Sequence, residues 1–223
     1  MVVDEAFPFI RDATGPGRSE LSALRPARVP AATPLLRRGD PAGGAYLVLA
    51  GALRVFYVTD NGREATLYHV APGETCVLAL GATYARRPYP AWVEASHDGC
   101  TFVCVETAVF HRLLDSESSF RHFVMASMSA RIFDLMCALE ELATASIEQR
   151  VAGYLAKQAR GGDSVVVTQA ALAAELGTAR EVVFRAVRGL RNAGLVSTAR
   201  GRVHVVDPAG LAAAAAGRRA PPE

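Results

Sequence analysis

Two helical stretches separated by one glycine and followed by a short hairpin occupy residues 168–206, and no other segment constrains the fold as strongly. Thr168 can cap the first stretch, residues 169–176, which begins with Gln169. The apolar residues of this stretch recur at helical spacing: Leu172, Ala173 and Leu176. Gly177 then supplies the turn. Two short helices joined by a glycine-containing turn are typical of helix-turn-helix modules, whose second helix enters the major groove of DNA.

The second helix is predicted to begin near Ala179. Thr178 is a good N-cap, and Glu181 three positions later completes a capping box. Gly194 stands where a left-handed residue ends a helix, so this helix has about four turns. At about 100° per residue, its apolar face comprises Val183, Ala186, Val187 and Leu190. The opposite face comprises Glu181, Phe184, Arg185, Arg188 and Asn192, with Arg180 at its edge.

A hairpin and an excess of basic residues accompany the two helices. Two strands are predicted at 195–198 and 202–206, joined by Ala199, Arg200 and Gly201. Such a hairpin is typical of a wing, on which Arg200 and Arg202 would contact phosphate. From residue 150 to residue 206 the chain has nine Lys or Arg and three Asp or Glu, whereas the whole chain has a net charge of +2. Exposed arginines often contact only solvent, but cap, turn, hairpin and charge together favour DNA binding.

Length and composition are ordinary for a folded soluble protein of one large or two small domains: 223 residues, 51% hydrophobic and 21% charged. No run of about 18 apolar residues occurs, and the N-terminus has acidic residues and no apolar core. We therefore expect a cytoplasmic protein with no membrane partner. The four cysteines lie in no metal-ligand spacing, so no metal site is expected: Cys76, Cys100, Cys104 and Cys137. If Cys100 and Cys104 share a strand, their Cα atoms lie roughly 13 Å apart, beyond disulfide reach.

Short β-like runs alternate with turn signals over residues 34–112. The pair Asn61-Gly62 between two such runs predicts a hairpin, because a type I′ turn needs positive φ at both positions. Gly51 and the pair Pro72-Gly73 indicate two further turns. Repeated short strands of this kind predict an antiparallel barrel or roll, which can hold a ligand inside.

A long helix is predicted after the β-rich region. Its apolar residues recur at alternating steps of three and four, a seam of about two and a half heptads: Met125, Met128, Ile132, Leu135, Leu139 and Leu142. Such a narrow seam either pairs with a partner helix or packs on the chain's own β domain. Paired DNA-reading heads bind two half-sites about one helical turn apart, which favours a dimer.

The order of these parts resembles the CRP/FNR superfamily of bacterial transcription regulators, from about Leu35 to Leu211. The most specific segments are RRGDPAGGAYLVLAGALRVFYVTDNGRE, SIEQRVAGYLA and VTQAALAAELGTAREVVFRAVRGLRNAGLV. The resemblance implies an α+β protein with an N-terminal antiparallel β-roll, a jelly roll of the cyclic-nucleotide-binding type. It implies four parts: the sensor roll at 1–118, a dimerisation helix at 119–145, a winged helix-turn-helix at 146–212 and a flexible tail at 213–223. An alanine-rich helix is expected from Gly210 into this tail.

The resemblance also carries over specific DNA-reading residues. In the CRP branch an Arg-Glu pair opens the recognition helix and an Arg follows four residues after the Glu; these are Arg180, Glu181 and Arg185 here. Arginine can bond guanine O6 and N7, and glutamate can accept from cytosine N4, each contributing about 1 to 3 kcal/mol of discrimination. A capping-box role would compete with base reading by Glu181. The expected DNA contacts are Thr168, Gln169, Thr178, Arg180, Glu181, Phe184, Arg185, Arg188, Arg200 and Arg202.

Two residues of this helix depart from the family pattern. Ala179 and Phe184 stand where the family usually has a small hydroxyl residue and a small residue. Phe184 either meets a thymine methyl group or changes the docking angle. The operator is therefore expected to differ from the family's commonest one.

The effector is less well specified. Cyclic-nucleotide binders of the family place an Arg and a Ser or Thr before the Ala that leads into a strand, but this chain has Tyr89 and Pro90 there. Cyclic nucleotide is therefore disfavoured, although Arg86 and Arg87 lie nearby. No cysteine precedes Cys76, which argues against an N-terminal iron–sulfur cluster.

Cys76 falls where the CO-sensing haem members of the family have a haem-ligating cysteine. Those members also use a His two residues later, where this chain has Leu78. Haem bound through Cys76, redox sensing by its thiol, an unknown small molecule and no ligand all remain open. The candidate effector pocket comprises Cys76, Tyr84, Arg86, Arg87, Tyr89 and Trp92.

These observations favour a homodimeric transcription regulator that binds palindromic double-stranded DNA under control of a signal sensed in the roll. RNA polymerase is a further candidate partner. The chain has no paired carboxylates in a Gly-rich setting, no G-x-S-x-G, no phosphate loop and no metal-binding His pair, so an enzyme is not expected. A ligand-binding or scaffold module that uses the winged head for protein contacts is the alternative, and activation and repression are equally open.

Overall fold

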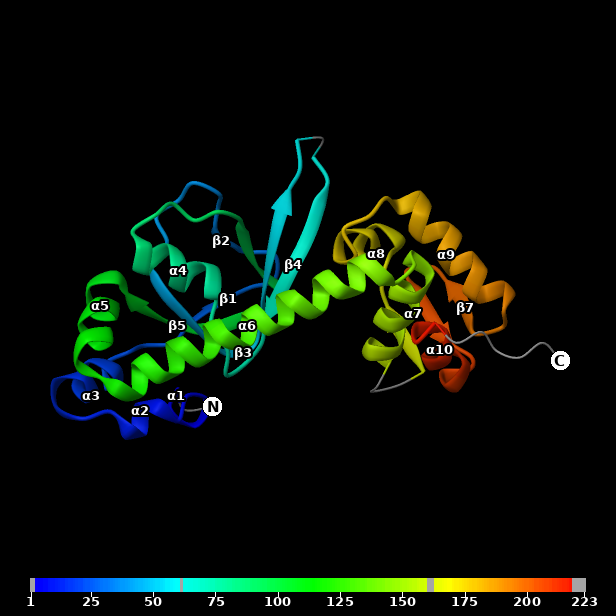
Figure 1. The fold of residues 1–223 in the computed structure, drawn as a ribbon. Helices are drawn as coiled ribbons and strands as arrows, with labels where there is room; N and C mark the ends of the chain where they lie inside the picture. Colours follow the sequence, from blue (N-terminus) through cyan, green and yellow to red (C-terminus); the bar gives the residue numbers. More distant parts are fainter. Residues whose placement is uncertain (1–2, 61, 160–162, 218–223) are drawn as a thin grey trace. The chain divides into compact units, whose positions relative to one another are not determined.

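Two compact units make up the computed structural model, which describes residues 3–60, 62–159 and 163–217 (Figure 1). The first unit comprises Met1–Val58 and Leu67–Leu135, and the second comprises Thr59–Thr66 and Met136–Glu223. The predicted α+β class, with a β-rich region, a long helix and a C-terminal helix-turn-helix, is confirmed. The division between the units lies inside the long helix, so the boundaries at 118, 145 and 212 stay predictions.

A five-stranded antiparallel sheet forms the roll of the first unit. Its strand order is β1-β5-β3-β4, with β2 also paired to β5. The strands are β1 (Ala27–Val29), β2 (Pro34–Leu36), β3 (Gly44–Val58), β4 (Glu64–Val70) and β5 (Trp92–Glu106). The two 15-residue strands β3 and β5 pair from Gly44↔Glu106 to Phe56↔Trp92. Cys100 and Cys104 both lie on β5, as expected.

One predicted turn is wrong. Gly51 lies inside β3, where its φ of 70° accompanies a shift in the pairing register with β5. A Cβ at this position would collide with the carbonyl of Gly99, so the glycine permits a bulge and not a chain reversal. The turn at Pro72-Gly73 is confirmed, and Gly62 has φ 76° in the hairpin between β3 and β4. Asn61 lies outside the described residues.

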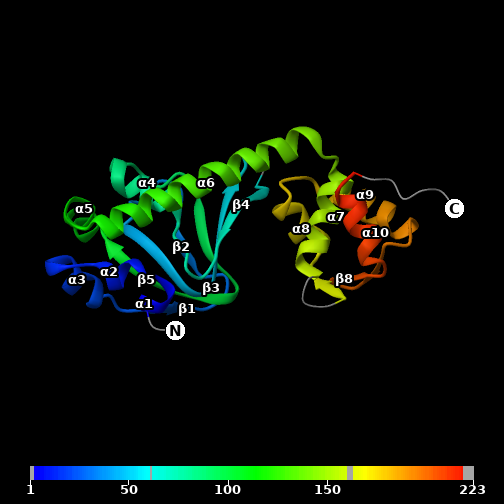
Figure 2. The same ribbon diagram turned by 60° about the horizontal axis from the view of Figure 1, so that its bottom comes forward.

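Helices pack around the sheet of this unit, and the first five of the six were not predicted (Figure 2). The helices of the unit are α1 (Val3–Ala6), α2 (Phe9–Asp12), α3 (Gly15–Ser22), α4 (Val77–Ala85), α5 (Thr107–Ser116) and α6 (Ser118–Thr144). Phe7 and Phe9 of the N-terminal segment pack with Phe110 and Phe120 in one hydrophobic core. A second core fills the roll itself and includes Val55, Tyr89, Val93 and Phe102.

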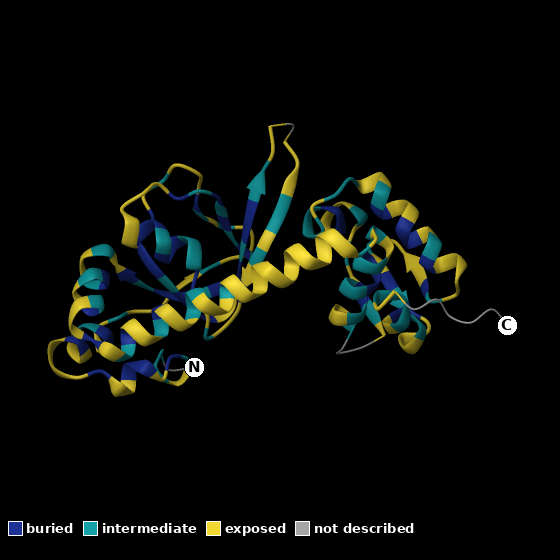
Figure 3. Cartoon of the chain, in the orientation of Figure 1, coloured by how far each residue is buried: buried dark blue, intermediate teal, exposed yellow. Residues whose placement is uncertain are grey.

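The long helix α6 begins and ends within one residue of the helix expected at 119–145. Its first turns bury Phe120 and Val124, whereas most of its remaining length is exposed (Figure 3). By length and a mean hydropathy of 1.3, it is the one described helix that could cross a membrane. The burial of its first turns in the core of a folded unit argues against that role.

The second unit contains the predicted winged helix-turn-helix. Its elements are α7 (Ile147–Gln158), β6 (Ser164–Val166), α8 (Gln169–Glu175), α9 (Arg180–Asn192), β7 (Val196–Ala199), β8 (Arg202–Val205) and α10 (Pro208–Ala215). The sheet order is β6-β8-β7, so β6 adds a third strand that the sequence analysis missed. The alanine-rich helix is confirmed as α10, which continues into the part of the predicted tail at 213–215. Residues 218–223 of that tail lie outside the described residues.

Candidate nucleic-acid interface and effector region

The first helix of the motif begins as the sequence predicts. Thr168 is the N-cap of α8, and its hydroxyl oxygen accepts a hydrogen bond from the Ala171 N–H at 3.1 Å. Leu172 and Ala173 are buried. Gly177 follows the helix with a φ of 60°, a backbone conformation that favours glycine.

The start of the recognition helix α9 corrects the predicted cap. Ala179, not Thr178, is the N-cap residue, and no side chain caps the helix. The backbone N–H of Thr178 donates to the Ala173 carbonyl at 2.9 Å, so Thr178 belongs to the turn that closes α8. Glu181 consequently stands at the second helical position and not at the third, which removes the capping box. Glu181 therefore has no capping-box role that would compete with base reading.

The two faces of α9 match the predicted periodicity. The buried face comprises Val183, Ala186, Val187 and Leu190. The exposed face comprises Arg180, Glu181, Phe184, Arg185, Arg188 and Asn192. Arg191 is also exposed and lines a small depression with Phe184 and Gln169, a position that the face analysis left out. The side chains of Glu181 and of the three arginines at positions 180, 185 and 188 are thus exposed and do not pack in the core.

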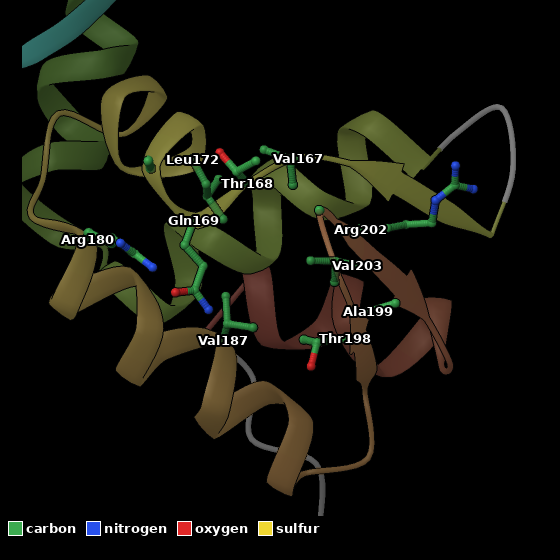
Figure 4. A pocket seen from close by; sticks show the side chains of 12 residues that line it. Val167, Thr168, Gln169, Leu172, Arg180, Val187, Thr198, Ala199, Arg202 and Val203 are labelled. Carbon is green, nitrogen blue, oxygen red and sulfur yellow. The ribbon is translucent and has the colours of Figure 1, made fainter.

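A pocket of about 520 Å³ lies between α8, α9 and the wing (Figure 4). Thr168, Gln169 and Arg180 line it from the helices, and Thr198 and Arg202 line it from the hairpin. The guanidinium of Arg202 points to the far side of the hairpin, away from α9 (Figure 4). There its Nη1 donates to Ser164 Oγ on β6 at 3.2 Å. The structure therefore groups the helix residues together and directs Arg202 elsewhere.

The wing is a tight hairpin. Strand β7 pairs with β8 from Val196↔Val205 to Ala199↔Arg202, which leaves Arg200 and Gly201 as a two-residue turn. Gly201 has a φ of 70°, and Arg200 is exposed at the tip. The missed strand β6 contains Val165 and Val166 of the β-branched run Val165 to Val167, a signal that sequence reasoning could have used.

Inside the roll, two of the six candidate effector residues meet. Cys76 and Tyr89 are each 1% exposed, and the Cys76 Sγ lies 3.4 Å from the Tyr89 hydroxyl. Tyr68, which the sequence analysis missed, places its hydroxyl 3.7 Å from the same sulfur and accepts a hydrogen bond from the Leu78 N–H at 3.2 Å. Burial raises the pKa of Tyr68 and of Tyr89, so both phenols stay neutral hydrogen-bonding groups. The guanidinium of Arg131 on α6 lies over the Tyr68 ring, 4.1 Å from its centre.

The other four candidates lie apart from this thiol–phenol cluster of Cys76, Tyr68 and Tyr89. Tyr84 is 68% exposed, and Arg86 and Arg87 are exposed after the end of α4. Trp92 stacks on Phe56, with ring centres 6.4 Å apart. The effector pocket of six residues stays a prediction: Cys76 and Tyr89 are in contact, whereas Arg86 and Arg87 follow the end of α4 and are exposed.

The described residues do not fit a cyclic phosphate or an axial haem ligand. At the position of the family's phosphate-binding Arg, the phenol of Tyr89 is buried and its backbone bonds to Gly39 and Asp40. The Cys76 thiol is enclosed by two phenols rather than open to a metal. Among the described residues, no group of three or more His, Cys, Asp or Glu could share a metal ion.

The predicted seam of α6 is mostly exposed. Met125, Ile132, Leu135, Leu139 and Leu142 are exposed, each by at least half. Met128 differs because it packs partly against the core of its own unit. Two exposed neighbours, Phe133 and Met136, were not predicted since they fall outside the heptad positions.

A β-roll followed by a long helix and a winged helix-turn-helix with a basic outer face defines a transcription regulator with a sensor domain. Residues 26–117 match the cyclic nucleotide-binding domain, and residues 149–214 match the Crp-like helix-turn-helix domain. The chain belongs to the CRP/FNR family of transcription regulators.

Several relatives agree with this assignment. The chain is 28% identical over 194 residues to the transcriptional activator protein Anr of Pseudomonas aeruginosa, covering 82% of this chain and 78% of the relative. It is 29% identical over 192 residues to the cyclic AMP receptor protein of Thermus thermophilus, covering 85% of this chain and 87% of the relative. A CRP-family regulator from Thermus thermophilus has a similar structure, with a TM-score of 0.72, 25% identity and coverage of 86% and 97%. A CRP/FNR-family regulator from Eubacterium rectale shares the fold, with a TM-score of 0.87, 24% identity and coverage of 95% and 99%.

Proposed function

We propose that this transcription regulator acts as a homodimer that reads palindromic double-stranded DNA with the exposed face of α9. The observation that carries the proposal is the division of α9 into a fully packed apolar face and a face on which Arg180, Glu181 and Arg185 are all exposed. A helix arranged in this way can enter the major groove without giving up any of its packing.

Residues of the first two turns of α9 are proposed to contact the bases. Arg180 and Arg185 suit guanine O6 and N7, and Glu181 suits cytosine N4. Since Glu181 does not serve in a capping box, its carboxylate is available to a base. Phosphate contacts are proposed for Thr168, Gln169, Thr178, Arg188 and Arg200, and a weaker one for Arg202, whose guanidinium already bonds Ser164. Phe184 is 48% exposed and would meet a thymine methyl group.

The exposed seam of α6 is proposed as the dimer interface. Leucine and isoleucine side chains that are half exposed or more on a helix of 27 residues favour burial against a second copy. A two-fold dimer also presents two heads to two half-sites, which matches palindromic DNA.

The signal is proposed to act in the roll, through a ligand other than a cyclic nucleotide or through the Cys76 thiol. The thiol–phenol cluster supports the proposal of another ligand, because neutral groups stand where a cyclic phosphate would need a positive charge. A cytoplasmic location, contact with RNA polymerase and the absence of enzymatic activity complete the proposal, on the strength of the family.

In vitro selection of DNA by the full-length protein tests the proposed reading. We expect a palindrome whose half-sites are about one helical turn apart, and affinity that falls steeply with added salt because phosphate contacts release counterions. Leu139→Glu should produce a monomer by sedimentation and lose the palindromic preference, whereas Lys157→Glu on the exposed side of α7 should stay dimeric. A dimer that selects no sequence would support the scaffold alternative instead.

A further inference from the structure

A groove of about 460 Å³ lies on the N-terminal helices of the first unit. Helices α1, α2 and α3 and the stretch up to Pro26 form its walls. Its lining combines apolar and basic side chains, among them Ile10, Leu21, Leu24, Arg11, Arg18 and Arg25. The volume suits a small ligand, and the mixture of an apolar surface with a few charges is typical of a ligand site.

The floor of this groove is anchored in the hydrophobic core. Ile10 is 6% exposed and Leu21 is 2% exposed, and both belong to the cluster that also contains Phe120 of α6. Leu24 is partly buried against the same cluster. The apolar surface of the groove is therefore a fixed feature of the fold.

The rim of the groove carries three cations and one carboxylate. Arg25 Nη1 donates to the carbonyls of Ser22 and Leu24, each at 3.3 Å, which fixes its guanidinium at the end of α3. Arg11 Nε pairs with Asp4 Oδ2 at 3.2 Å. The side chain of Arg18 is exposed, and its guanidinium makes no hydrogen bond or ion pair within the part of the chain that the structure describes. Two positive charges thus remain unbalanced beside an apolar floor.

Contacts on the opposite side hold the N-terminal helices in place. The backbone N–H of Thr14, the N-cap of α3, donates to Glu117 Oε2 at 3.1 Å. Gly17 leaves room for this buried carboxylate, since a Cβ there would collide with it. Arg112 bonds Glu20 through Nη2 at 2.6 Å and through Nε at 2.8 Å. The groove is therefore preformed, and Glu117 connects it to the junction of α5 and α6.

We propose that this groove binds a small amphipathic anion, a carboxylate with an aliphatic body. The body would pack on Ile10 and Leu21, and the carboxylate would lie against the arginines of the rim. Charge complementarity carries the assignment, because a neutral apolar ligand would leave two adjacent cations unused. This site is separate from the thiol–phenol cluster and from the DNA-reading face of α9.

Calorimetric titration of the full-length protein with octanoate tests the site, with octan-1-ol and acetate as the matched neutral and short-chain probes. We expect octanoate to bind with a dissociation constant of about 1 mM or tighter. Octan-1-ol and acetate should each bind at least about fivefold more weakly, since one lacks the charge and the other the apolar body.

Two surface variants sharpen the test without disturbing the core. Arg18→Gln should weaken octanoate binding about fivefold, whereas the matched change Arg28→Gln on β1, outside the groove, should leave it unchanged. Asp4→Asn should strengthen binding about twofold, because Asp4 competes for Arg11.

Equal affinity for octanoate and octan-1-ol, equal effects of Arg18→Gln and Arg28→Gln, or no octanoate binding at all would each overturn the proposal. The titration uses the protein without DNA. Its outcome is therefore independent of whether the proposed DNA reading is correct.

Discussion

The polar side chains of α9 are exposed to solvent, whereas those of the roll interior are buried and contact one another. On α9, Arg180, Glu181 and Arg185 face solvent while the other side of the helix is packed. In the roll, Cys76 and Tyr89 are almost completely buried and contact each other. The polar groups of α9 are therefore accessible to an external partner, whereas those of the roll stabilise its own core.

The largest effect is expected where the roll loses a buried ring. Tyr89→Ala should lower the free energy of unfolding by about 3 to 5 kcal/mol, because it leaves a cavity in the core. Tyr89→Phe keeps the ring and should cost only about 1 kcal/mol for the lost hydrogen bond. Urea unfolding of the two variants measures both values; similar small losses would mean that the ring is not a structural element of the roll.

The opposite pattern is expected on α9. Arg180→Ala and Arg185→Ala should each weaken binding to the selected operator by about 1 to 3 kcal/mol and relax the preference at one base pair. Their thermal midpoints should stay at the wild-type value because both side chains are exposed. Fluorescence anisotropy with Lys157→Ala as the control distinguishes base reading from a general loss of charge, and unchanged affinity in both variants would refute the proposed reading mode.

A smaller effect separates the two roles considered for Glu181. Without a capping box, Glu181→Ala should lower stability by only about 0.5 kcal/mol, through the lost interaction with the helix dipole. It should still relax the preference for one base pair. A stability loss of about 1 kcal/mol or more, with unchanged base preference, would restore the capping role.

A further effect concerns alkaline pH and again involves the roll. Burial raises the pKa of Cys100 and of Cys104 from 9.0 to about 11. Between these values the unfolded chain releases thiol protons that the folded chain retains, so stability present below pH 9.0 should decline as the pH rises toward about 11. Thermal midpoints across this range should fall less steeply for the double variant Cys100→Ala/Cys104→Ala; identical slopes would contradict the expectation.

Sequence periodicity predicted α9 well because its evidence is local. The spacing of Val183, Val187 and Leu190 defines the packed face, and Gly194 marks the end, within a single helix. The cap was missed by one residue, since the backbone of Thr178 bonds to α8, a contact that local spacing does not reveal.

The roll interior was harder to predict because strand pairing decides it. Tyr68 on β4 and Tyr89 after α4 contact Cys76 although neither shares a helix or strand with it, so helical or strand periodicity does not reveal the contact. The N-terminal helices were not predicted from the sequence for a different reason. Helices α1 and α2 are four residues long, too short to show a period, and Phe7 and Phe9 pack with aromatic residues about a hundred residues away.

The hydrogen bond between Thr14 and Glu117 spans 103 positions of the chain. During synthesis, α3 therefore emerges long before the carboxylate that accepts a hydrogen bond from the N–H of its N-cap residue. The aromatic residues around it stay uncovered until α5 and the start of α6 leave the ribosome, so the N-terminal segment should be among the last parts of this unit to gain protection.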